Sequence, residues 1–158
     1  MIRAITEVGV AVCDIEQATR MMVERLCAVA GPVQVAERFD MKFCMCRVGN
    51  VDFELMAPIG KDGVIARFIE RHGEGLHHIG FAVDDVAESQ AEMTSHGMKF
   101  VDATPGKMYF RFSDLAGKAG EGDVGFTFSR PDSLLGMLLE FIEYPLNSVA
   151  SSERTGSD

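Results

Sequence analysis

The segment ITEVGVAVCDI (residues 5–15) is repeated 71 positions later as LHHIGFAVDDV (residues 76–86). Both segments are rich in β-branched or aromatic side chains, which favour a short β-strand. Each contains an aspartate, Asp14 or Asp85, where its side chain can cap a following helix. A repeat of this kind indicates that the chain is built from two similar modules.

The helices expected after these strands also correspond. Gln17 and Glu88 stand three positions after the two aspartates, which is the spacing of a capping box. The first helix is predicted over residues 15–30, before a Gly-Pro pair, and the second over residues 86–96, before a glycine. Each module therefore begins with a strand followed by a helix.

The modules also end alike, because apolar runs around Glu54 and Glu140 read as closing strands. These glutamates are 86 positions apart, so the second module contains an insertion of 15 residues. We expect the insertion in residues 105–123, which read as a loop with one strand at residues 108–112. Further strands are predicted at residues 38–48 and 124–128.

The predicted fold class is α+β, with two tandem βαβββ modules related by a pseudo-twofold axis. The first module is assigned to residues 1–60 and the second to residues 76–147. A connector at residues 61–75 contains a short helix at residues 64–71, and residues 148–158 read as a disordered tail. The strands should form one curved mixed sheet, whose concave face makes a metal-binding cleft.

Composition narrows the function classes. Acidic side chains number 24 and basic ones 15, for a formal net charge of −9, which argues against binding a nucleic-acid backbone. No apolar run approaches the about 20 residues of a membrane span, and the N-terminal residues do not resemble a secretion signal. We therefore expect a cytoplasmic protein whose four cysteines are reduced, with Cys44 and Cys46 as small buried hydrophobic residues.

Four ionisable residues occupy equivalent places in the two modules. Glu7 corresponds to His78 on the opening strands, and Glu54 corresponds to Glu140 on the closing strands. A pseudo-twofold axis would bring all four into one cleft, where three carboxylates need a positive charge between them. One divalent ion, Zn²⁺, Co²⁺, Ni²⁺, Mn²⁺ or Fe²⁺, suits this set of oxygen and imidazole ligands.

Taken singly, each of these residues is open to a simpler interpretation. A lone glutamate in a strand usually faces solvent, and a lone histidine is usually a surface or hydrogen-bonded core residue. It is the symmetry of the four that favours a shared metal site. Strand alternation predicts that His77 faces away from His78, and His72 and His96 are expected at the surface.

The chain resembles the vicinal oxygen chelate superfamily (glyoxalase/bleomycin-resistance/dioxygenase), and within it the methylmalonyl-CoA epimerases. The resemblance is carried by GNVDFELMAP (residues 49–58), by VIARFIERHGEGLHHIGFAVDDV (residues 64–86) and by GMLLE (residues 136–140). It implies paired βαβββ modules, a homodimer, and a metal ion held by one residue from each of four strands.

The chain departs from the epimerase pattern at three places, one of which is that residues 105–123 form a longer stretch than the resemblance implies. The epimerases have histidine where this chain has Glu7. They also carry a glutamate in an E-Q-G motif, for which Glu37 is the nearest acid here.

The resemblance implies an epimerase or racemase that moves a proton at carbon 2 of a methylmalonyl-CoA-like acyl-CoA. Glu140 would be a metal ligand and the base on one face of that carbon, and Glu37 the base on the other. The phosphates of an acyl-CoA need cations, for which the sequence offers the following patch: Lys99, Lys107, Arg111, Lys118 and Arg130.

Two other functions also agree with the sequence. A glyoxalase-I-like lyase or isomerase would use similar proton chemistry, and its pattern tolerates carboxylates at the metal positions. A non-catalytic small-molecule binder would usually lack the ligand set. An extradiol dioxygenase is disfavoured, because it needs two histidines and one carboxylate, and only His78 stands on the pattern.

Overall fold

The structure is a computed structural model that describes residues 1–113 and 119–143. Its strands are β1 (Ile2–Ala11), β2 (Val29–Ala30), β3 (Gln34–Ala36), β4 (Met41–Val48), β5 (Val51–Pro58), β6 (Gly75–Val83), β7 (Gly106–Ser113), β8 (Ala119–Phe128) and β9 (Leu139–Glu143). Its helices are α1 (Ile15–Leu26), α2 (Val64–His72) and α3 (Val86–Ser95), with short 3₁₀ helices η1 (Glu37–Phe39) and η2 (Pro131–Ser133). No helix in these described ranges has the length and apolar character of a membrane span. The predicted tail at residues 148–158 lies outside the described residues.

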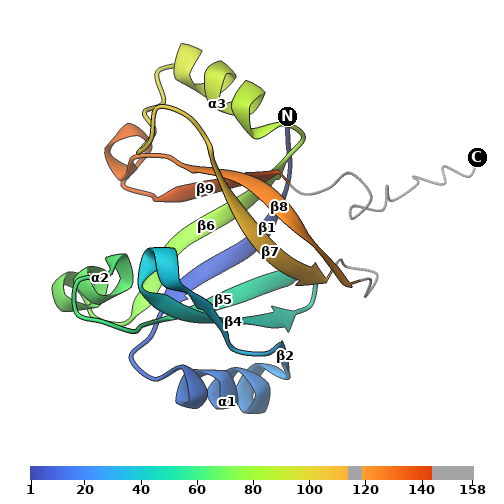
Figure 1. The fold of residues 1–158 in the computed structure, drawn as a ribbon, viewed down its shortest axis with the longest axis vertical. Helices are drawn as coiled ribbons and strands as arrows, with labels where there is room; N and C mark the ends of the chain where they lie inside the picture. The colour runs from blue at the N-terminus through green and yellow to red at the C-terminus, as the bar shows by residue number, and fades with distance from the viewer. Residues whose placement is uncertain (114–118, 144–158) are drawn as a thin grey trace, which may run out of the picture.

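The strands form one curved mixed sheet in the order β2-β4-β5-β1-β6-β9-β8-β7, with β3 also paired to β4 (Figure 1). In the first half β1 runs parallel to β5, and in the second β6 runs parallel to β9. The antiparallel pair β1/β6 joins the two halves at the centre. The α+β class with two βαβββ modules, predicted from the repeat, is therefore confirmed.

Both helix starts follow the predicted caps. The backbone N–H of Gln17 donates to the Asp14 carboxylate at 2.8 Å, and that of Glu88 donates to Asp85 at 2.8 Å. The end of the first helix was predicted too late. Helix α1 stops at Leu26 because Cys27 adopts a left-handed conformation (φ 54°), and the next residues form β2 at the sheet edge.

Within residues 105–123 the predicted strand at residues 108–112 is confirmed as part of β7, but the loop predicted around it is wrong for residues 119–123, which belong to β8. Strands β7 and β8 form a long antiparallel hairpin here, paired from Gly106 with Phe126 to Ser113 with Ala119. Glycines at three positions of β8 resemble loop composition, but main-chain pairing with β7 supplies the ladder that composition does not reveal. The first half has only short β2 and β3 beside β4, so the insertion lengthens the corresponding edge of the second half.

Two hydrophobic clusters attach the flanking helices to the sheet. Helix α1 packs over a cluster that includes Ile15, Cys44, Cys46 and Leu55. Cys44 and Cys46 are buried, as predicted, and burial beside Cys44 raises the pKa of the Cys46 thiol to about 12. Helix α3 covers a second cluster in the other half, and the two helices lie at opposite ends of the molecule (Figure 1).

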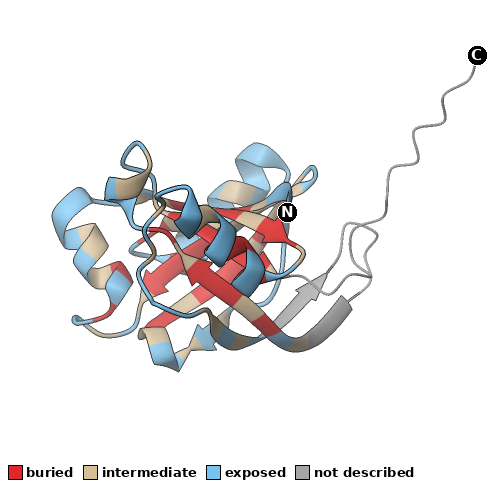
Figure 2. Ribbon diagram, turned by 90° about the horizontal axis from the view of Figure 1, so that it is seen from above, coloured by how far each residue is buried: buried red, intermediate tan, exposed pale blue. Residues whose placement is uncertain are grey.

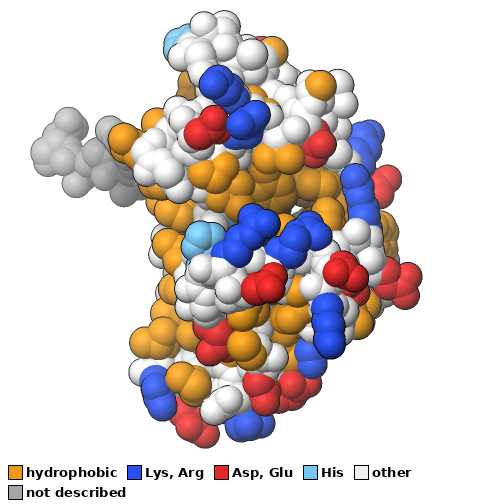
Figure 3. All heavy atoms as spheres, turned by 90° about the vertical axis from the view of Figure 1, so that its left-hand side faces the viewer, with side chains coloured by type: hydrophobic (Ala, Val, Ile, Leu, Met, Phe, Trp, Pro, Cys, Tyr) orange, Lys and Arg blue, Asp and Glu red, His pale blue; other side chains and the backbone are white. Residues whose placement is uncertain are grey.

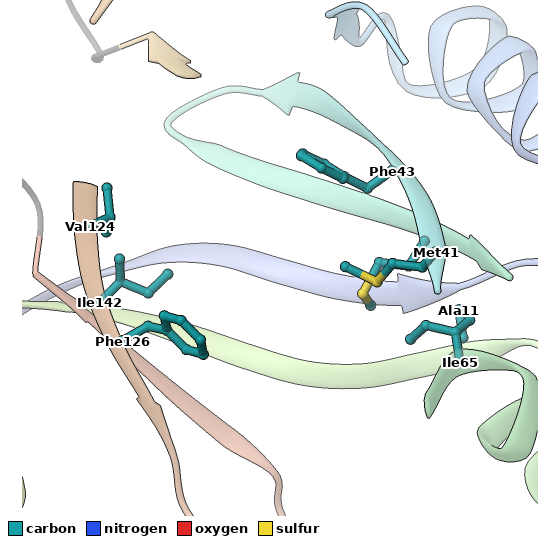
Figure 4. Close-up of a cluster of buried hydrophobic side chains, with 8 residues drawn as sticks. Ala11, Met41, Phe43, Ile65, Val124, Phe126 and Ile142 are labelled. Carbon is teal, nitrogen blue, oxygen red and sulfur yellow. The ribbon is translucent and has the colours of Figure 1, made fainter. Parts of the chain in front are cut away.

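The third cluster lies on the concave face and takes side chains from both halves. Its buried members are Ala11, Met41, Phe43, Met56, Ile65, Val124, Phe126 and Ile142. In Figure 4 the labelled members come from strands of both modules and from α2, and they gather beside the central strands β1 and β6. The burial-coloured view likewise shows the central strands as the most buried part of the molecule (Figure 2). This concave face holds the candidate site.

Candidate metal centre in an apolar cavity

The central strand pair places Glu7 and His78 symmetrically. In the β1/β6 register Glu7 lies opposite Gly80, and His78 lies opposite Gly9. The same two glycines lie beside the closing strands, where Gly9 pairs with Glu54 and Gly80 pairs with Glu140. Each half therefore contributes one residue from its opening strand and one from its closing strand, as the repeat predicts.

The glycines leave the space that the two central side chains occupy. A Cβ atom on Gly9 would lie 2.2 Å from Cε1 of His78, and one on Gly80 would lie 2.3 Å from Cγ of Glu7. Any other residue at either position would push a cluster side chain aside. The matching glycines of the repeat thus have a steric role at the site.

Replacing Gly9 by alanine should displace the His78 ring and lower divalent-metal affinity at least about tenfold, because ligand orientation governs affinity. Isothermal titration with Zn²⁺ measures the change, and circular dichroism checks that the fold persists. Gly122→Ala is the control, because a Cβ there meets no atom within 4 Å. Equal affinity in the Gly9 variant and the control would contradict the steric role.

Two β-bulges aim the cluster side chains. The β1/β6 register skips Thr6 on β1 and His77 on β6, and these residues are equivalent in the repeat. Each immediately precedes a cluster residue, and a bulge re-aims side chains in this way. The prediction that His77 faces away from the site is wrong, because the bulge lets both His77 and His78 line the same cavity.

The four residues predicted from the repeat meet around the imidazole of His78. Its Nε2 atom lies 3.1 Å from Oε2 of Glu140, 3.4 Å from Oε1 of Glu7 and 3.7 Å from Oε2 of Glu54. One ligand atom each from Glu7, His78 and Glu140 lies within 4.8 Å of the others. All four residues are at most 9% exposed. The donor chemistry, burial and mutual distances fit a divalent ion, with Glu54 at the margin of the group.

The three carboxylates of the cluster are buried close together and repel one another when they are all ionised. Burial, and then the charge of Glu7, raises the pKa of Glu54 to about 8 and raises that of Glu140 well above its usual range. Burial lowers the pKa of His78, but hydrogen bonds to Glu140 and Glu7 outweigh it and raise this pKa well above its usual value. A cation bound among these groups would relieve the repulsion between the buried carboxylates.

His77 supports the back of the His78 ring. The two Nδ1 atoms are 2.9 Å apart, and the His77 ring also packs edge-on against Phe68 of α2 at 4.8 Å between centroids. Burial and the neighbouring His78 lower the pKa of His77 to about 4, so it is neutral near pH 7. If Nε2 of His78 binds a metal ion, its Nδ1 carries the proton, and Nδ1 of neutral His77 is placed to accept a hydrogen bond from it.

Replacing His77 by phenylalanine should lower metal affinity about 10- to 100-fold, the usual cost of losing a partner that orients a ligand. The phenyl ring retains the packing against Phe68 but accepts no hydrogen bond. Metal titration measures the effect, with His72→Ala as control, because exposed His72 contacts Phe68 but is not among the residues of the cavity. Unchanged affinity in the His77 variant would show that the contact orients nothing.

The cluster lies in a cavity of about 330 Å³ whose other walls are mostly apolar. Met41 and Met56 come from the first half, and Val124, Phe126 and Ile142 from the second. In the space-filling view a hollow lined by hydrophobic side chains opens on the face that carries α2, and Lys and Arg side chains stand near its rim (Figure 3). Such a cavity excludes water from a reacting group and strengthens charge interactions within it.

The segment before β4 reaches the cavity that holds the cluster, but not through the acid predicted from the sequence. Arg38 and Phe39 line the cavity, whereas Glu37 is exposed and lines a neighbouring cavity instead. Among the described residues Arg38 is the one Lys or Arg side chain that lines the cluster's cavity. Sequence reasoning missed Arg38, because it sought an acid in this segment. The role of Glu37 as second base stays a prediction.

Of the predicted cation patch, the three side chains that the structure describes do not line the cluster's cavity. Lys99 and Arg130 are exposed, and Arg130 pairs with Asp132 at 3.1 Å. Lys107 lines the neighbouring cavity. The side chain of Arg111, and Lys118 as a whole, lie outside what the structure describes. His72 and His96 are exposed, as predicted.

Comparison with known proteins places the chain in a family. The sequence model described as Glyoxalase/Bleomycin resistance protein/Dioxygenase superfamily matches residues 6–112. The chain belongs to this superfamily, in agreement with the resemblance found in the sequence.

Several relatives and solved structures that resemble the chain are epimerases. An ethylmalonyl-CoA/methylmalonyl-CoA epimerase of Cereibacter sphaeroides is 28% identical over 100 residues, 63% of this chain and 75% of that protein. An uncharacterised Bacillus subtilis protein is 26% identical over 137 residues, 86% of this chain and 89% of that one. A Streptomyces coelicolor methylmalonyl-CoA epimerase in complex with 2-nitronate-propionyl-CoA matches with a TM-score of 0.77 at 19% identity, covering 95% and 100% of the two chains. That structural match shows the shared fold.

Proposed function

We propose that the protein is a metal-dependent epimerase or racemase that moves a proton at carbon 2 of a methylmalonyl-CoA-like acyl-CoA. The observation that carries this function is the buried Glu7/His78/Glu140 group, with Glu54 beside it, in an apolar cavity. The epimerase relatives support the same class of reaction. A homodimer working in the cytoplasm is part of the proposal, and light scattering on purified protein tests the dimer.

The cluster has the chemistry that this reaction needs. Glu7, Glu54, His78 and Glu140 would hold a divalent ion, which would supply Lewis-acid stabilisation of the charge that develops on the substrate oxygens. Glu140 removes the proton from carbon 2, because its buried carboxylate lines the cavity in which the reacting carbon would lie. The apolar walls keep water from the reacting carbon.

Return of the proton to the opposite face needs a second acid. Glu37 remains the residue predicted from the resemblance, although its exposed side chain lines the neighbouring cavity. Within the described lining of the cluster's cavity, Asp102 is a further carboxylic acid outside the metal group.

Because Glu37 does not line the cluster's cavity, we expect Glu37→Gln to retain deuterium exchange at carbon 2 within about threefold and to retain inversion as well. NMR follows exchange, and circular dichroism of the product follows inversion, with Asp102→Asn as the parallel variant. Loss of inversion with retained exchange in the Glu37 variant would instead establish it as the second base.

Solvent exchange tests the proposed function itself. Protein loaded with Co²⁺ or Zn²⁺ is incubated with methylmalonyl-CoA in D₂O, and NMR follows deuterium at carbon 2. We expect catalysed exchange that chelation abolishes and metal restores. Absence of exchange in metal-loaded protein would refute the proposed epimerase activity. Turnover of the hemithioacetal of methylglyoxal and glutathione would then point to the glyoxalase-I-like reaction, and stoichiometric metal would count against a non-catalytic binder.

A further inference from the structure

The opening strands of the two halves bring different side chains to the candidate metal centre, whereas the closing strands bring the same one. Glu54 on β5 and Glu140 on β9 are both glutamates at equivalent positions of the repeat. Glu7 on β1 and His78 on β6 are equivalent as well, but one is a carboxylate and the other an imidazole. The ligand set therefore offers three oxygen donors and one nitrogen donor, where a histidine at position 7 would give two of each.

The side chain of Glu7 is built into the centre. It is 4% exposed, and its Oε1 lies 3.4 Å from Nε2 of His78. Gly80, opposite it on β6, leaves the room that its Cγ occupies. One oxygen of Glu7 also belongs to the group of ligand atoms that lie within 4.8 Å of one another. An ion bound in this group would therefore contact Glu7 directly.

The described residues offer no second imidazole and no thiolate to such an ion. His77 lines the cavity, but its Nδ1 lies 2.9 Å from Nδ1 of His78, on a different edge of that ring from Nε2. The ring of His77 is also packed against Phe68 at 4.8 Å between centroids. None of the four cysteines lines the cavity. The single nitrogen donor of the centre is thus His78.

Donor type decides which divalent ions a centre of this kind favours. Imidazole suits Zn²⁺, Ni²⁺ and Cu²⁺, whereas carboxylates suit Mg²⁺ and Mn²⁺. The affinity of any nitrogen and oxygen site still rises from Mn²⁺ toward Zn²⁺, so selectivity is expressed in the ratio of the two affinities. An oxygen donor in place of a second nitrogen removes part of the advantage of Zn²⁺. The charge of the extra carboxylate attracts both divalent ions alike.

We propose that Glu7 sets the metal selectivity of the centre, so that the preference for Zn²⁺ over Mn²⁺ is weaker than a second histidine would make it. The inference rests on the proposed function, because it concerns the ion that the epimerase would use. A centre with this donor set takes up Mn²⁺ wherever Mn²⁺ is more available than Zn²⁺, since availability decides occupancy when affinities are close.

Replacing Glu7 by histidine tests the assignment, because it restores the symmetric set of two imidazoles and two carboxylates. The ratio of Zn²⁺ affinity to Mn²⁺ affinity should rise about tenfold. Electron paramagnetic resonance of free Mn²⁺ measures one affinity, and competition with a zinc indicator measures the other. Circular dichroism checks that the variant folds. An unchanged ratio in the folded variant would overturn the proposal.

Glu7→Gln separates the donor atom from its charge. The amide keeps an oxygen donor at the same place and loses the charge, so both affinities should fall while their ratio stays within about threefold. A ratio that rises as much as in Glu7→His would overturn the proposal, because charge would then set the selectivity. Glu24→His adds an imidazole at an exposed site on α1 and should leave the ratio unchanged. An equal rise in this control would also overturn the role of Glu7.

His78→Gln keeps the proposal testable if Glu7→His does not fold. It removes the nitrogen donor and leaves Glu7 in place, so the affinity for Zn²⁺ should fall about tenfold more than that for Mn²⁺. Equal losses for the two ions would overturn the dependence on donor type.

These measurements need no substrate, so they separate the selectivity from the proposed function. A raised ratio in Glu7→His, in a protein that shows no exchange at carbon 2, would reject the epimerase and retain the role of Glu7. An unchanged ratio in a protein that catalyses exchange would reject the selectivity alone. Failure of the wild-type protein to bind either ion would overturn both.

Discussion

Replacing His78 by alanine should lower the affinity for Zn²⁺ or Co²⁺ about 100-fold or more. Zinc-site binding energies of roughly 10–16 kcal/mol, divided among four ligands, correspond to about 3 kcal/mol per ligand. His78 is central to the group, because its Nε2 lies 3.1 Å from Glu140 and 3.4 Å from Glu7. Calorimetric titration of the protein, after a chelator has removed bound metal, measures the change.

His96→Ala is the matched control for this experiment. His96 is exposed at the end of α3, in a different part of the molecule, and its removal should leave metal affinity unchanged. The metal affinity of His77→Phe should lie between the affinities of His78→Ala and His96→Ala. Metal binding by the His78 variant at the wild-type affinity would show that the ion binds elsewhere or that another register of β6 is correct.

Replacing Glu140 by glutamine should lower the rate of deuterium exchange at carbon 2 about 10²- to 10⁴-fold, the usual contribution of a general base. The amide keeps an oxygen ligand, so metal binding should weaken but persist. Measurement at saturating metal separates the loss of the base from the loss of the ion. The expected result is therefore a metal-loaded protein with little exchange.

Glu54→Gln provides the matched comparison. Glu54 occupies the equivalent strand position in the first half, is also buried, and lies 3.7 Å from Nε2 of His78. Its replacement should reduce exchange far less than the Glu140 variant at saturating metal. If the two variants lose exchange equally, the assignment of the base to Glu140 is wrong and the carboxylates act only as ligands.

The repeat carried much of the information needed to predict the fold. Matching glycines and capping aspartates 71 positions apart predicted the two opening strands and the starts of α1 and α3. The same offset predicted that Glu7 would meet His78, since a pseudo-twofold axis brings equivalent positions together. Internal symmetry thus supplied long-range contacts that local propensities cannot provide.

Other features depend on contacts that a single sequence does not display. His77 was expected to face away from the site because strands alternate, but a bulge breaks the alternation at this residue. The hairpin β7/β8 was expected to be mostly a loop because its glycines favour turns. Arg38 was overlooked because its place beside the cluster arises from η1 and the approach of two sheet edges, which are distant in sequence.

The proposed function requires a divalent ion bound among Glu7, Glu54, His78 and Glu140. Anomalous diffraction from crystals grown with Co²⁺, collected on both sides of the cobalt absorption edge, tests it most directly. We expect one strong peak about 2.0–2.2 Å from Nε2 of His78 and from carboxylate oxygens of Glu7 and Glu140. Its absence at full cobalt occupancy in solution, or a peak elsewhere on the protein, would contradict the account.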